Sequence, residues 1–388
     1  MRLVKVAVAT GVALASLAVP TPASSAAHAL TAGVQARIDA AAKQDVDSGH
    51  VAGAAIAVLR GGQLIFARGY GRSNLELGTL VTTRTVFRIG SLTKQFTAVG
   101  VLLLAERGKL KIDDKLSSYL PNFPRANEVT LRDLLNHTSG IHNFTDGPVV
   151  DKISTTGATA QQLVDDIAGQ SPLYDFDPGK GWWYSNSNYA LLGAVIEKAS
   201  GESWAAFVKT EIFDKLGMAD TAADDARDVV RGRASGYGLI GGVPSKFRNA
   251  DFTDMSVPYA AGALRSTADD MARWNAALFG GKILKPDSLN EMMAPGRLRN
   301  GAENQTAIAW PSGKASSPPA GFVPGFYAFG VDHHSENGRA IVGHDGSIAG
   351  FDAVMRTYVD QDLTIIVLTN TNGGAHPLEA KIARILTP

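Results

Sequence analysis

Residues 90–106 read GSLTKQFTAVGVLLLAE, and this stretch predicts the most apolar helix of the chain. Its part Gln95–Glu106 has the composition of a buried helix, which Gly108 then ends. Ser91 stands at the start of the helix, where the positive end of the helix dipole favours an oxyanion or an alkoxide. Lys94 follows one turn later on the same face, so its amine is expected to meet the serine hydroxyl.

The apolar setting of Lys94 suggests a chemical role for this pair. Lys94 is the only charged residue between Arg88 and Glu106. Loss of solvent would lower the pKa of its ammonium group, and the neutral amine could then take the proton of Ser91. The alternative is a helix-capping serine followed by a solvated lysine, which is the commoner meaning of an isolated S-x-x-K string.

The amino-acid composition excludes several classes of partner and site. The chain has 388 residues, 45% apolar and 19% charged, as expected for a globular protein with one large domain or two lobes. Its 37 basic and 37 acidic residues balance, so no basic excess indicates nucleic acid as a partner. The absence of cysteine excludes disulfides, zinc–thiolate sites, iron–sulfur clusters and thiol catalysis.

The N-terminal residues resemble an export signal. Arg2 and Lys5 precede an apolar run, Val6–Val19, and Ala27-His28-Ala29 forms an A-x-A cleavage pattern. A membrane anchor is the alternative, but the run is shorter than the ~20 residues that span a bilayer. We therefore expect a signal peptide over residues 1–29, cleaved near Ala29, and a secreted or periplasmic protein without a membrane span.

The remaining pattern predicts an α+β fold. Strand patterns occur near both ends of the chain, and helical patterns fill the middle. We expect one antiparallel sheet built from both chain ends and flanked by helices, plus an all-helical lobe. The α/β lobe is placed at about residues 30–95 and 255–388, the helical lobe at about 96–254, and the active site between them. A segment rich in Pro, Gly and Ser, residues 310–326, predicts a loop.

A second candidate motif is Tyr184-Ser185-Asn186, which precedes a helical pattern beginning at Tyr189. The phenol of Tyr184 can shuttle a proton between Ser91 and a leaving group. The amide of Asn186 can hold a substrate carbonyl or Lys94. The alternative is an aromatic patch followed by an asparagine in a turn or a helix cap.

A third candidate motif, HDGS at residues 344–347, ends a predicted strand. Gly346 would let a substrate approach the strand backbone closely. The backbone N–H of Ser347 could then complete an oxyanion hole with the N–H of Ser91. The alternative is a plain β-turn rich in Gly and Asp.

Histidines are assigned structural or supporting roles. His344 is expected to hydrogen-bond Tyr184 and to bias the position of its proton. His137 is expected to brace the helical lobe. The remaining histidines form no metal-ligand set, and the sequence has no H-E-x-x-H, P-loop or dinucleotide motif, so we expect no cofactor and no metal.

The three motifs, in the order S-x-x-K, Y-x-N and H-x-G, resemble those of the serine β-lactamase and penicillin-binding D,D-peptidase superfamily. The resemblance is closest to the class C β-lactamase-like branch, which includes D-alanyl-D-alanine carboxypeptidases, D-aminopeptidases and esterases. It covers about residues 35–385 and implies the β-lactamase/D,D-peptidase-like fold. Four further strings support it: Phe87 to Gly90, Leu134 to Ile141, Ile212 to Met218 and Ala261 to Thr267.

The resemblance implies roles for the candidate residues. Ser91 would be the acylated nucleophile and Lys94 its activating partner. Tyr184 would relay protons, and Asn186 would orient the substrate. His344 occupies the position where β-lactamases of this branch carry lysine, and this departure favours the peptidase and esterase members.

Asp345 is a second departure from the family pattern. Many penicillin-recognising members carry threonine there, which contacts the free carboxylate of the substrate, whereas an aspartate would repel that carboxylate. Either Asp345 points away from the substrate, or the preferred substrate is an amine-bearing D-peptide or an ester. Aromatic residues could line an apolar acyl pocket, although ordinary core packing also explains them: Trp182, Trp183, Tyr327 and Phe329.

The sequence therefore predicts an exported serine hydrolase that acts through an acyl-enzyme on D-amino-acid peptide bonds, with β-lactams as slow substrates or inhibitors. A carboxylesterase on the same scaffold is the alternative, and a non-catalytic binding protein is a remote one. The expected partner is a small peptide, β-lactam or ester, with no nucleic acid. The sequence leaves the oligomeric state open.

Overall fold

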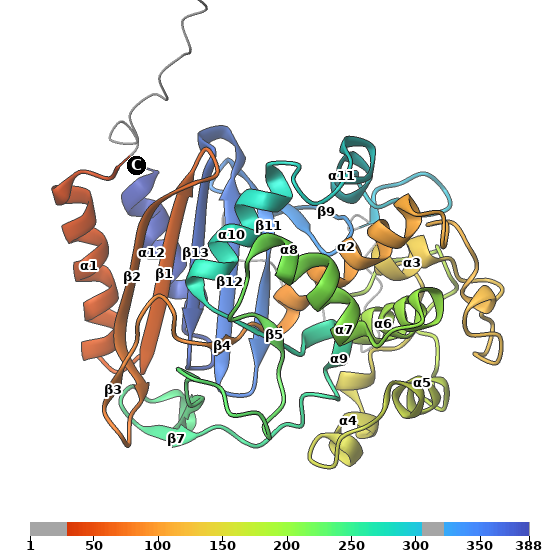
Figure 1. The fold of residues 1–388 in the computed structure, drawn as a ribbon, viewed down its shortest axis with the longest axis horizontal. Coiled ribbons are helices and arrows are strands. Elements are labelled where there is room, and N and C mark those ends of the chain that lie inside the picture. Colours follow the sequence, from red (N-terminus) through yellow and green to blue (C-terminus); the bar gives the residue numbers. More distant parts are fainter. Residues whose placement is uncertain (1–28, 305–321, 388) are drawn as a thin grey trace, which may run out of the picture.

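A computed structural model describes residues 29–304 and 322–387 of the chain. Its main feature is an eight-stranded sheet in the order β3-β2-β1-β13-β12-β11-β10-β9, with every neighbouring pair antiparallel (Figure 1). The strands come from both ends of the chain, as predicted. Their bounds are β1 (Gly53–Arg60), β2 (Gln63–Asn74), β3 (Thr79–Leu80), β9 (Phe322–Tyr327), β10 (Asp332–Glu336), β11 (Arg339–Ile348), β12 (Phe351–Tyr358) and β13 (Leu363–Thr369).

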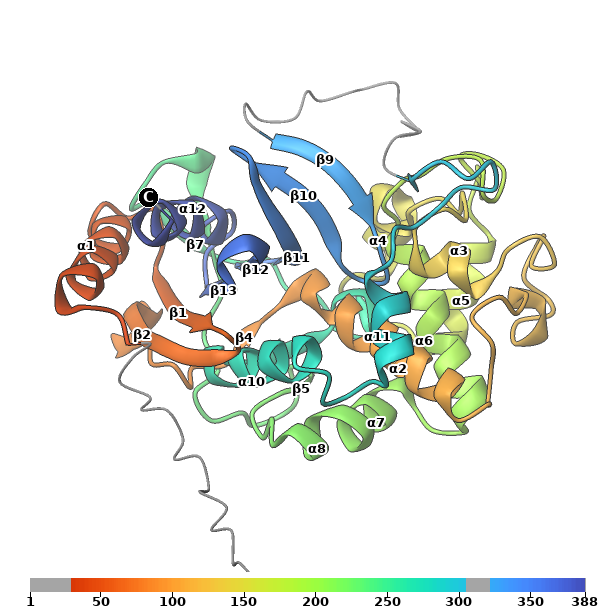
Figure 2. The same ribbon diagram turned by 90° about the horizontal axis from the view of Figure 1, so that it is seen from above.

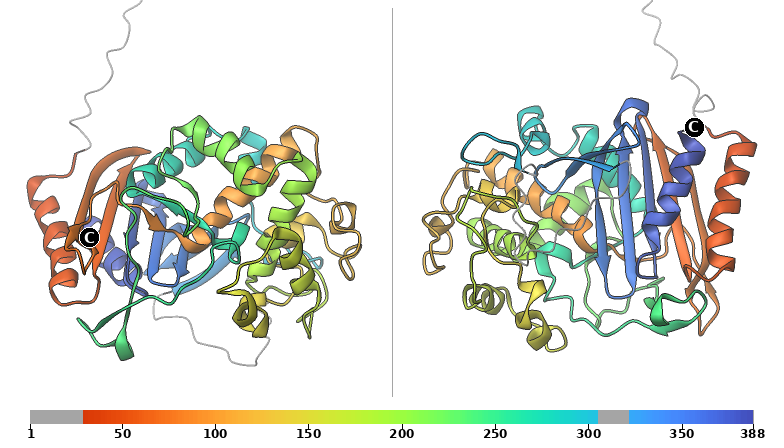
Figure 3. Two further views of the ribbon diagram at one scale, coloured as in Figure 1. Left: turned by 60° about the horizontal axis from the view of Figure 1, so that its bottom comes forward. Right: turned by 180° about the vertical axis from the view of Figure 1, so that it is seen from behind.

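Both faces of the central strands are buried, which explains their nearly continuous apolar sequences. Because side chains alternate along a strand, Ile56 of β1 packs towards α1 (Ala32–Asp47) and α12 (Ala375–Leu386). Its neighbour Ala57 packs into the larger core on the opposite face. Viewed from behind, α1 and α12 lie side by side against the sheet (Figure 3).

The other helices lie beyond the opposite face of the sheet (Figure 2). Their bounds are α2 (Thr93–Glu106), α3 (Leu131–Leu135), α4 (Pro148–Ile153), α5 (Ala160–Ala168), α6 (Asn186–Ser200), α7 (Trp204–Val208), α8 (Asp214–Leu216), α9 (Tyr259–Gly262), α10 (Ala268–Phe279) and α11 (Pro286–Met293). Within residues 29–304 and 322–387, no helix is both long and apolar enough to cross a membrane.

The apolar segment that follows Ser91 forms α2, and it is buried from Thr93 to Leu104. A short 3₁₀ turn, Gly90–Leu92, joins it to β4 (Phe87–Arg88). Phe96 stacks on Trp274 of α10 with 4.1 Å between ring centroids, which ties α2 to a helix that covers the sheet. The start of α2 therefore lies where the sheet and the helices meet.

The predicted loop needs correction at one end, and most of the predicted signal peptide lies outside the described residues. The predicted loop 310–326 is wrong at its end, because residues 322–327 form β9. Pro324 is tolerated there because β9 is an edge strand and its pairing with β10 shifts register beside Pro324. The rest of that loop, and the predicted signal peptide 1–29 apart from Ala29, lie outside the described residues.

The division into two lobes stays a prediction, but the middle of the chain is not wholly helical. Residues 96–254 also contain three short strands, β5 (Ala222–Ala223), β6 (Tyr237–Leu239) and β7 (Phe247–Asn249). β5 pairs with β8 (Leu264–Ser266), and β6 pairs with β7. Strands of two or three residues are too short to leave a periodic signal in the sequence.

We predict that Trp274→Ala lowers the free energy of unfolding by about 3–5 kcal/mol, because it empties a fully buried site between α10 and α2. It also removes the donor that bonds Gln95 Oε1 at 2.8 Å. Phe279→Ala, at the exposed end of the same helix, is the control and should cost about 1 kcal/mol or less. Urea denaturation measures both, and equal losses would contradict this packing.

Candidate active site

Two glycines bring β11 directly against the start of α2. Gly90 has φ +51°, and a Cβ there would lie 2.8 Å from the backbone nitrogen of Ser347. A Cβ on Gly346 would lie 2.0 Å from the carbonyl oxygen of Ile89 and 2.9 Å from the nitrogen of Ser91. Since no side chain fits at either position, the two segments cross in close contact. The crossing brings the backbone nitrogens of Ser91 and Ser347, the two donors expected to form an oxyanion hole, to the same place.

The amine of Lys94 is completely buried and has three polar neighbours. Nζ lies 2.9 Å from Ser91 Oγ, 2.7 Å from Asn186 Oδ1 and 2.8 Å from the carbonyl oxygen of Ala261. Burial lowers the pKa of Lys94 well below its usual value, which favours the neutral amine. A neutral amine has two N–H groups and one lone pair. Its two N–H groups go to the two carbonyl oxygens, which leaves the lone pair for the hydroxyl of Ser91.

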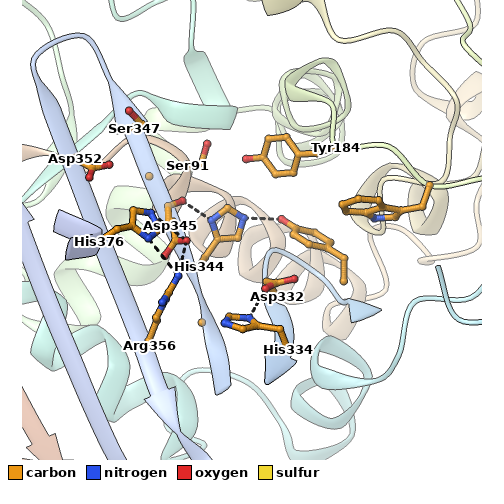
Figure 4. Close-up of a pocket in the computed structure, with 14 residues that line it drawn as sticks. Ser91, Tyr184, Asp332, His334, His344, Asp345, Ser347, Asp352, Arg356 and His376 are labelled. Atoms are coloured by element: carbon orange, nitrogen blue, oxygen red, sulfur yellow. Dashed lines mark hydrogen bonds and ion pairs between the residues drawn. The ribbon is translucent and has the colours of Figure 1, made fainter. Parts of the chain in front are cut away.

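Tyr184 completes the group on the far side of the serine. Its hydroxyl points towards Ser91 (Figure 4). Burial raises the pKa of Tyr184, although the nearby Ser91 opposes the shift, so the phenol keeps its proton at neutral pH. Lys94 Nζ lies 4.7 Å from the centre of the Tyr184 ring.

Asn186 begins α6 and is held at both ends of its amide. Its oxygen accepts from Lys94, and its Nδ2 donates to Thr145 Oγ1 at 3.0 Å. Sequence reasoning left open whether this amide holds a substrate carbonyl or Lys94. The structure places it on Lys94.

The predicted bond between His344 and Tyr184 is wrong. His344 Nε2 lies 2.9 Å from the hydroxyl of Tyr327, and its Nδ1 lies 2.6 Å from the carbonyl oxygen of Asp345. Since a carbonyl only accepts, Nδ1 carries the proton, and Nε2 accepts from Tyr327. Burial lowers the pKa of His344, in keeping with this neutral form. Tyr327 was missed as the partner because it reaches the site from the end of β9, a relationship that no local pattern reveals.

A cavity of about 280 Å³ opens beside Ser91 (Figure 4). Of the four aromatic residues considered for an acyl pocket, Trp182 and Tyr327 line it, whereas Trp183 does not. Phe329 is buried in the main core. No group of side chains in the described part of the chain has the arrangement of a metal site.

Asp345 is among the residues that line this cavity. Its Oδ2 lies 3.2 Å from Arg356 Nη2 and 3.3 Å from His376 Nε2. Arg356 is shared with two more carboxylates, Glu336 at 3.0 Å and Glu379 at 3.4 Å. One guanidinium thus faces three carboxylates, of which Asp345 lines the cavity.

Sequence reasoning missed Arg356 and His376. Arg356 lies opposite Gly343 in the register of β11 and β12, diagonal to Asp345 on the same face. His376 begins α12, after β13. Strand pairing brings Arg356 to Asp345, whereas the packing of α12 on the sheet brings His376 there, so no local sequence pattern could have revealed them.

Comparisons with known proteins agree with this geometry. A family model described as Beta-lactamase matches residues 38–387. A penicillin-binding protein of Bacillus subtilis (strain 168) is 31% identical over 319 residues, which are 80% of this chain and 66% of that protein. The chain therefore spans just under two-thirds of that relative's length.

Two solved structures share the fold. The D-amino acid amidase from Ochrobactrum anthropi SV3 has 24% identity and a TM-score of 0.75, over 92% of this chain and 98% of that chain. A D-stereospecific amidohydrolase from Streptomyces sp. has 25% identity and a TM-score of 0.71, over 89% of this chain and 97% of that chain.

The burial of Lys94 predicts a pH-dependent stability. Its pKa is lowered in the folded state and close to 10.5 in the unfolded state, so between these values the unfolded state binds more protons. The free energy of unfolding of the native protein should therefore rise relative to that of Lys94→Met as the pH increases from 7 towards 10. The difference should grow by up to about 1.4 kcal/mol per pH unit.

Urea denaturation across this pH range measures the difference. Lys152→Met is the matched control, because the Lys152 side chain is 77% exposed and should change the pH slope little. Parallel pH dependences of the native protein and Lys94→Met would mean that Lys94 is protonated in the folded state.

Proposed function

The chain belongs to the β-lactamase family, and from this premise we propose that it is an exported serine hydrolase that cleaves amide bonds of D-amino acids through an acyl-enzyme. The observation that carries the proposal is the contact between the buried amine of Lys94 and the hydroxyl of Ser91. Burying a lysine away from solvent, with no carboxylate among its hydrogen-bond partners, lowers the stability of the folded protein. Such an arrangement is typical of a catalytic base.

In the proposed reaction the lone pair of Lys94 takes the proton of Ser91 while Oγ bonds to the substrate carbonyl carbon. The developing oxyanion is stabilised by the backbone N–H groups of Ser91 and Ser347. Tyr184 gives its proton to the leaving nitrogen, the C–N bond breaks, and the proton on Lys94 then restores the phenol. Water attacks the resulting ester by the reverse proton transfers, which releases the acid and regenerates the serine.

The preference for D-amino acids draws on the relatives. One similar structure is named a D-amino acid amidase, another a D-stereospecific amidohydrolase, and the curated relative is named a penicillin-binding protein. Export draws on the signal-like residues 1–29 and would place the enzyme with extracellular D-peptides. The carboxylesterase alternative uses the same four side chains, because an ester needs the same attack at a carbonyl carbon.

The carboxylate of Asp345 favours a substrate with an amine over one with a carboxylate. Asp345 shares Arg356 with Glu336 and Glu379, so the charge of this guanidinium is divided among three carboxylates. An ammonium group near Asp345 would be stabilised instead. We therefore favour D-amino acid amides and D-peptides with a free amine over substrates that end in D-Ala-D-Ala.

We predict that a fluorescent penicillin or a fluorophosphonate labels the protein covalently and that Ser91→Ala abolishes labelling, because Oγ is the acylated atom. Ser118→Ala is the matched control, since Ser118 is exposed and remote from the motifs. Gel fluorescence and mass spectrometry of the adduct measure the result. Labelling by neither probe would contradict the proposed hydrolase. Turnover of p-nitrophenyl butyrate without turnover of any D-amino acid amide would favour the esterase.

A second prediction concerns Asp345. Asp345→Thr should raise kcat/KM for a D-Ala-D-Ala peptide and lower it for D-alaninamide, each by about tenfold, because it removes a charge that repels carboxylates and attracts amines. Asp345→Asn separates the loss of charge from the gain of a hydroxyl. An unchanged ratio of the two kcat/KM values in both variants would show that Asp345 does not select the substrate.

A further inference from the structure

His137 is buried at the centre of an aromatic cluster beside the proposed catalytic group. Its ring lies 4.5 Å from the ring of Tyr184, 4.6 Å from that of Tyr327 and 5.2 Å from that of Tyr189, measured between centroids. It has no exposed surface. Sequence reasoning assigned it only to bracing of the helical lobe, but its contacts converge on one residue, Tyr184.

His137 binds the backbone on both sides of Tyr184. Its carbonyl oxygen accepts from the N–H of Trp183, and its Nδ1 accepts from the N–H of Ser185, each at 3.2 Å. The side-chain amide of Asn188 donates to the same Nδ1 at 3.0 Å. One residue therefore holds the chain immediately before and after Tyr184 while its ring packs against the phenol.

The conformation of His137 shows that this arrangement has a cost. Its φ is +60°, in the left-handed region that few residues with a side chain adopt. Because Nδ1 accepts, the ring proton lies on Nε2, and this buried N–H has no partner in the described residues. Asparagine would tolerate the same φ and offer an acceptor in the place of Nδ1, but it has no ring to pack against the phenol of Tyr184.

We propose that His137 is a positioning residue, which fixes the phenol of Tyr184 against Ser91 for proton transfer through its two backbone hydrogen bonds and its ring. The inference rests on the proposed function, since it acts through the proton relay. It predicts that loss of His137 slows acylation without removing any group that touches the substrate. A displacement of the phenol by about 1 Å would be enough for a large effect.

The test measures the rate constant of acylation by a fluorescent penicillin in single-turnover experiments on folded protein. His137→Gly keeps the left-handed backbone but loses the acceptor and the ring, and it should acylate roughly 10- to 100-fold more slowly. His137→Asn keeps an acceptor in the position of Nδ1 and should fall between the native protein and His137→Gly. His142→Gly is the matched control, because that histidine bonds Asp175 instead and should leave the rate unchanged.

The deciding measurement is a double-mutant cycle with Tyr184→Phe. If His137 acts through the hydroxyl of Tyr184, the substitutions at His137 should slow acylation no further once that hydroxyl is gone. A native rate in His137→Gly, or the same slowing in the native and Tyr184→Phe backgrounds, would overturn the proposal. Should His137→Gly fail to fold, the cycle with His137→Asn decides alone.

The failure of this inference is distinct from the failure of the proposed function. If the native protein is not labelled at Ser91, the hydrolase proposal fails. If it is labelled and Tyr184→Phe is slow, but the His137 variants behave additively with it, only the positioning role of His137 fails.

Discussion

The arrangement of the candidate active site depends on the burial of one amine, that of Lys94. Lys94 carries its nitrogen into a site without solvent, where two carbonyl oxygens occupy its two N–H groups. In the neutral amine, which burial favours, the lone pair is left for Ser91, as the proposed role of Lys94 as the base requires. The surrounding helices and strands supply the groups that contact this amine and Ser91.

Three segments far apart in the chain meet at that amine. α6 supplies Asn186, α9 supplies the carbonyl of Ala261, and the turn before α2 supplies Ser91. β11 then passes close over the turn because Gly90 and Gly346 carry no side chains. A single methyl group at either glycine would push β11 away from Ser91. The backbone N–H groups of Ser91 and Ser347 would then move apart.

The wall of the cavity adds a second electrostatic constraint. Burial lowers the pKa of both Lys94 and His344, which favours their neutral forms. Asp345 shares Arg356 with Glu336 and Glu379, so the charge of this guanidinium is divided among three carboxylates. In the proposed function, substrate selection and proton transfer therefore lie with different residues of the same cavity.

Much of the fold follows from local sequence patterns. The apolar stretch after Lys94 determines a buried helix, since no alternative buries so many apolar side chains, and the apolar runs near both chain ends determine the strands. The spacing of Ser91 and Lys94 indicates that they lie on the same side of the chain where the 3₁₀ turn leads into α2, because three residues make almost one helical turn. The three motifs could therefore be recognised from the sequence.

The partners across the sheet were decided only by the tertiary structure. His344 bonds Tyr327 in place of Tyr184, because the end of β9 lies beside it. Asp345 meets Arg356 through strand pairing and His376 through the packing of α12 on the sheet. The two hydrogen bonds between His137 and the backbone on either side of Tyr184 likewise join segments that are distant in the sequence. Sequence patterns report the face of an element that is buried, whereas the register between elements determines which side chains meet there.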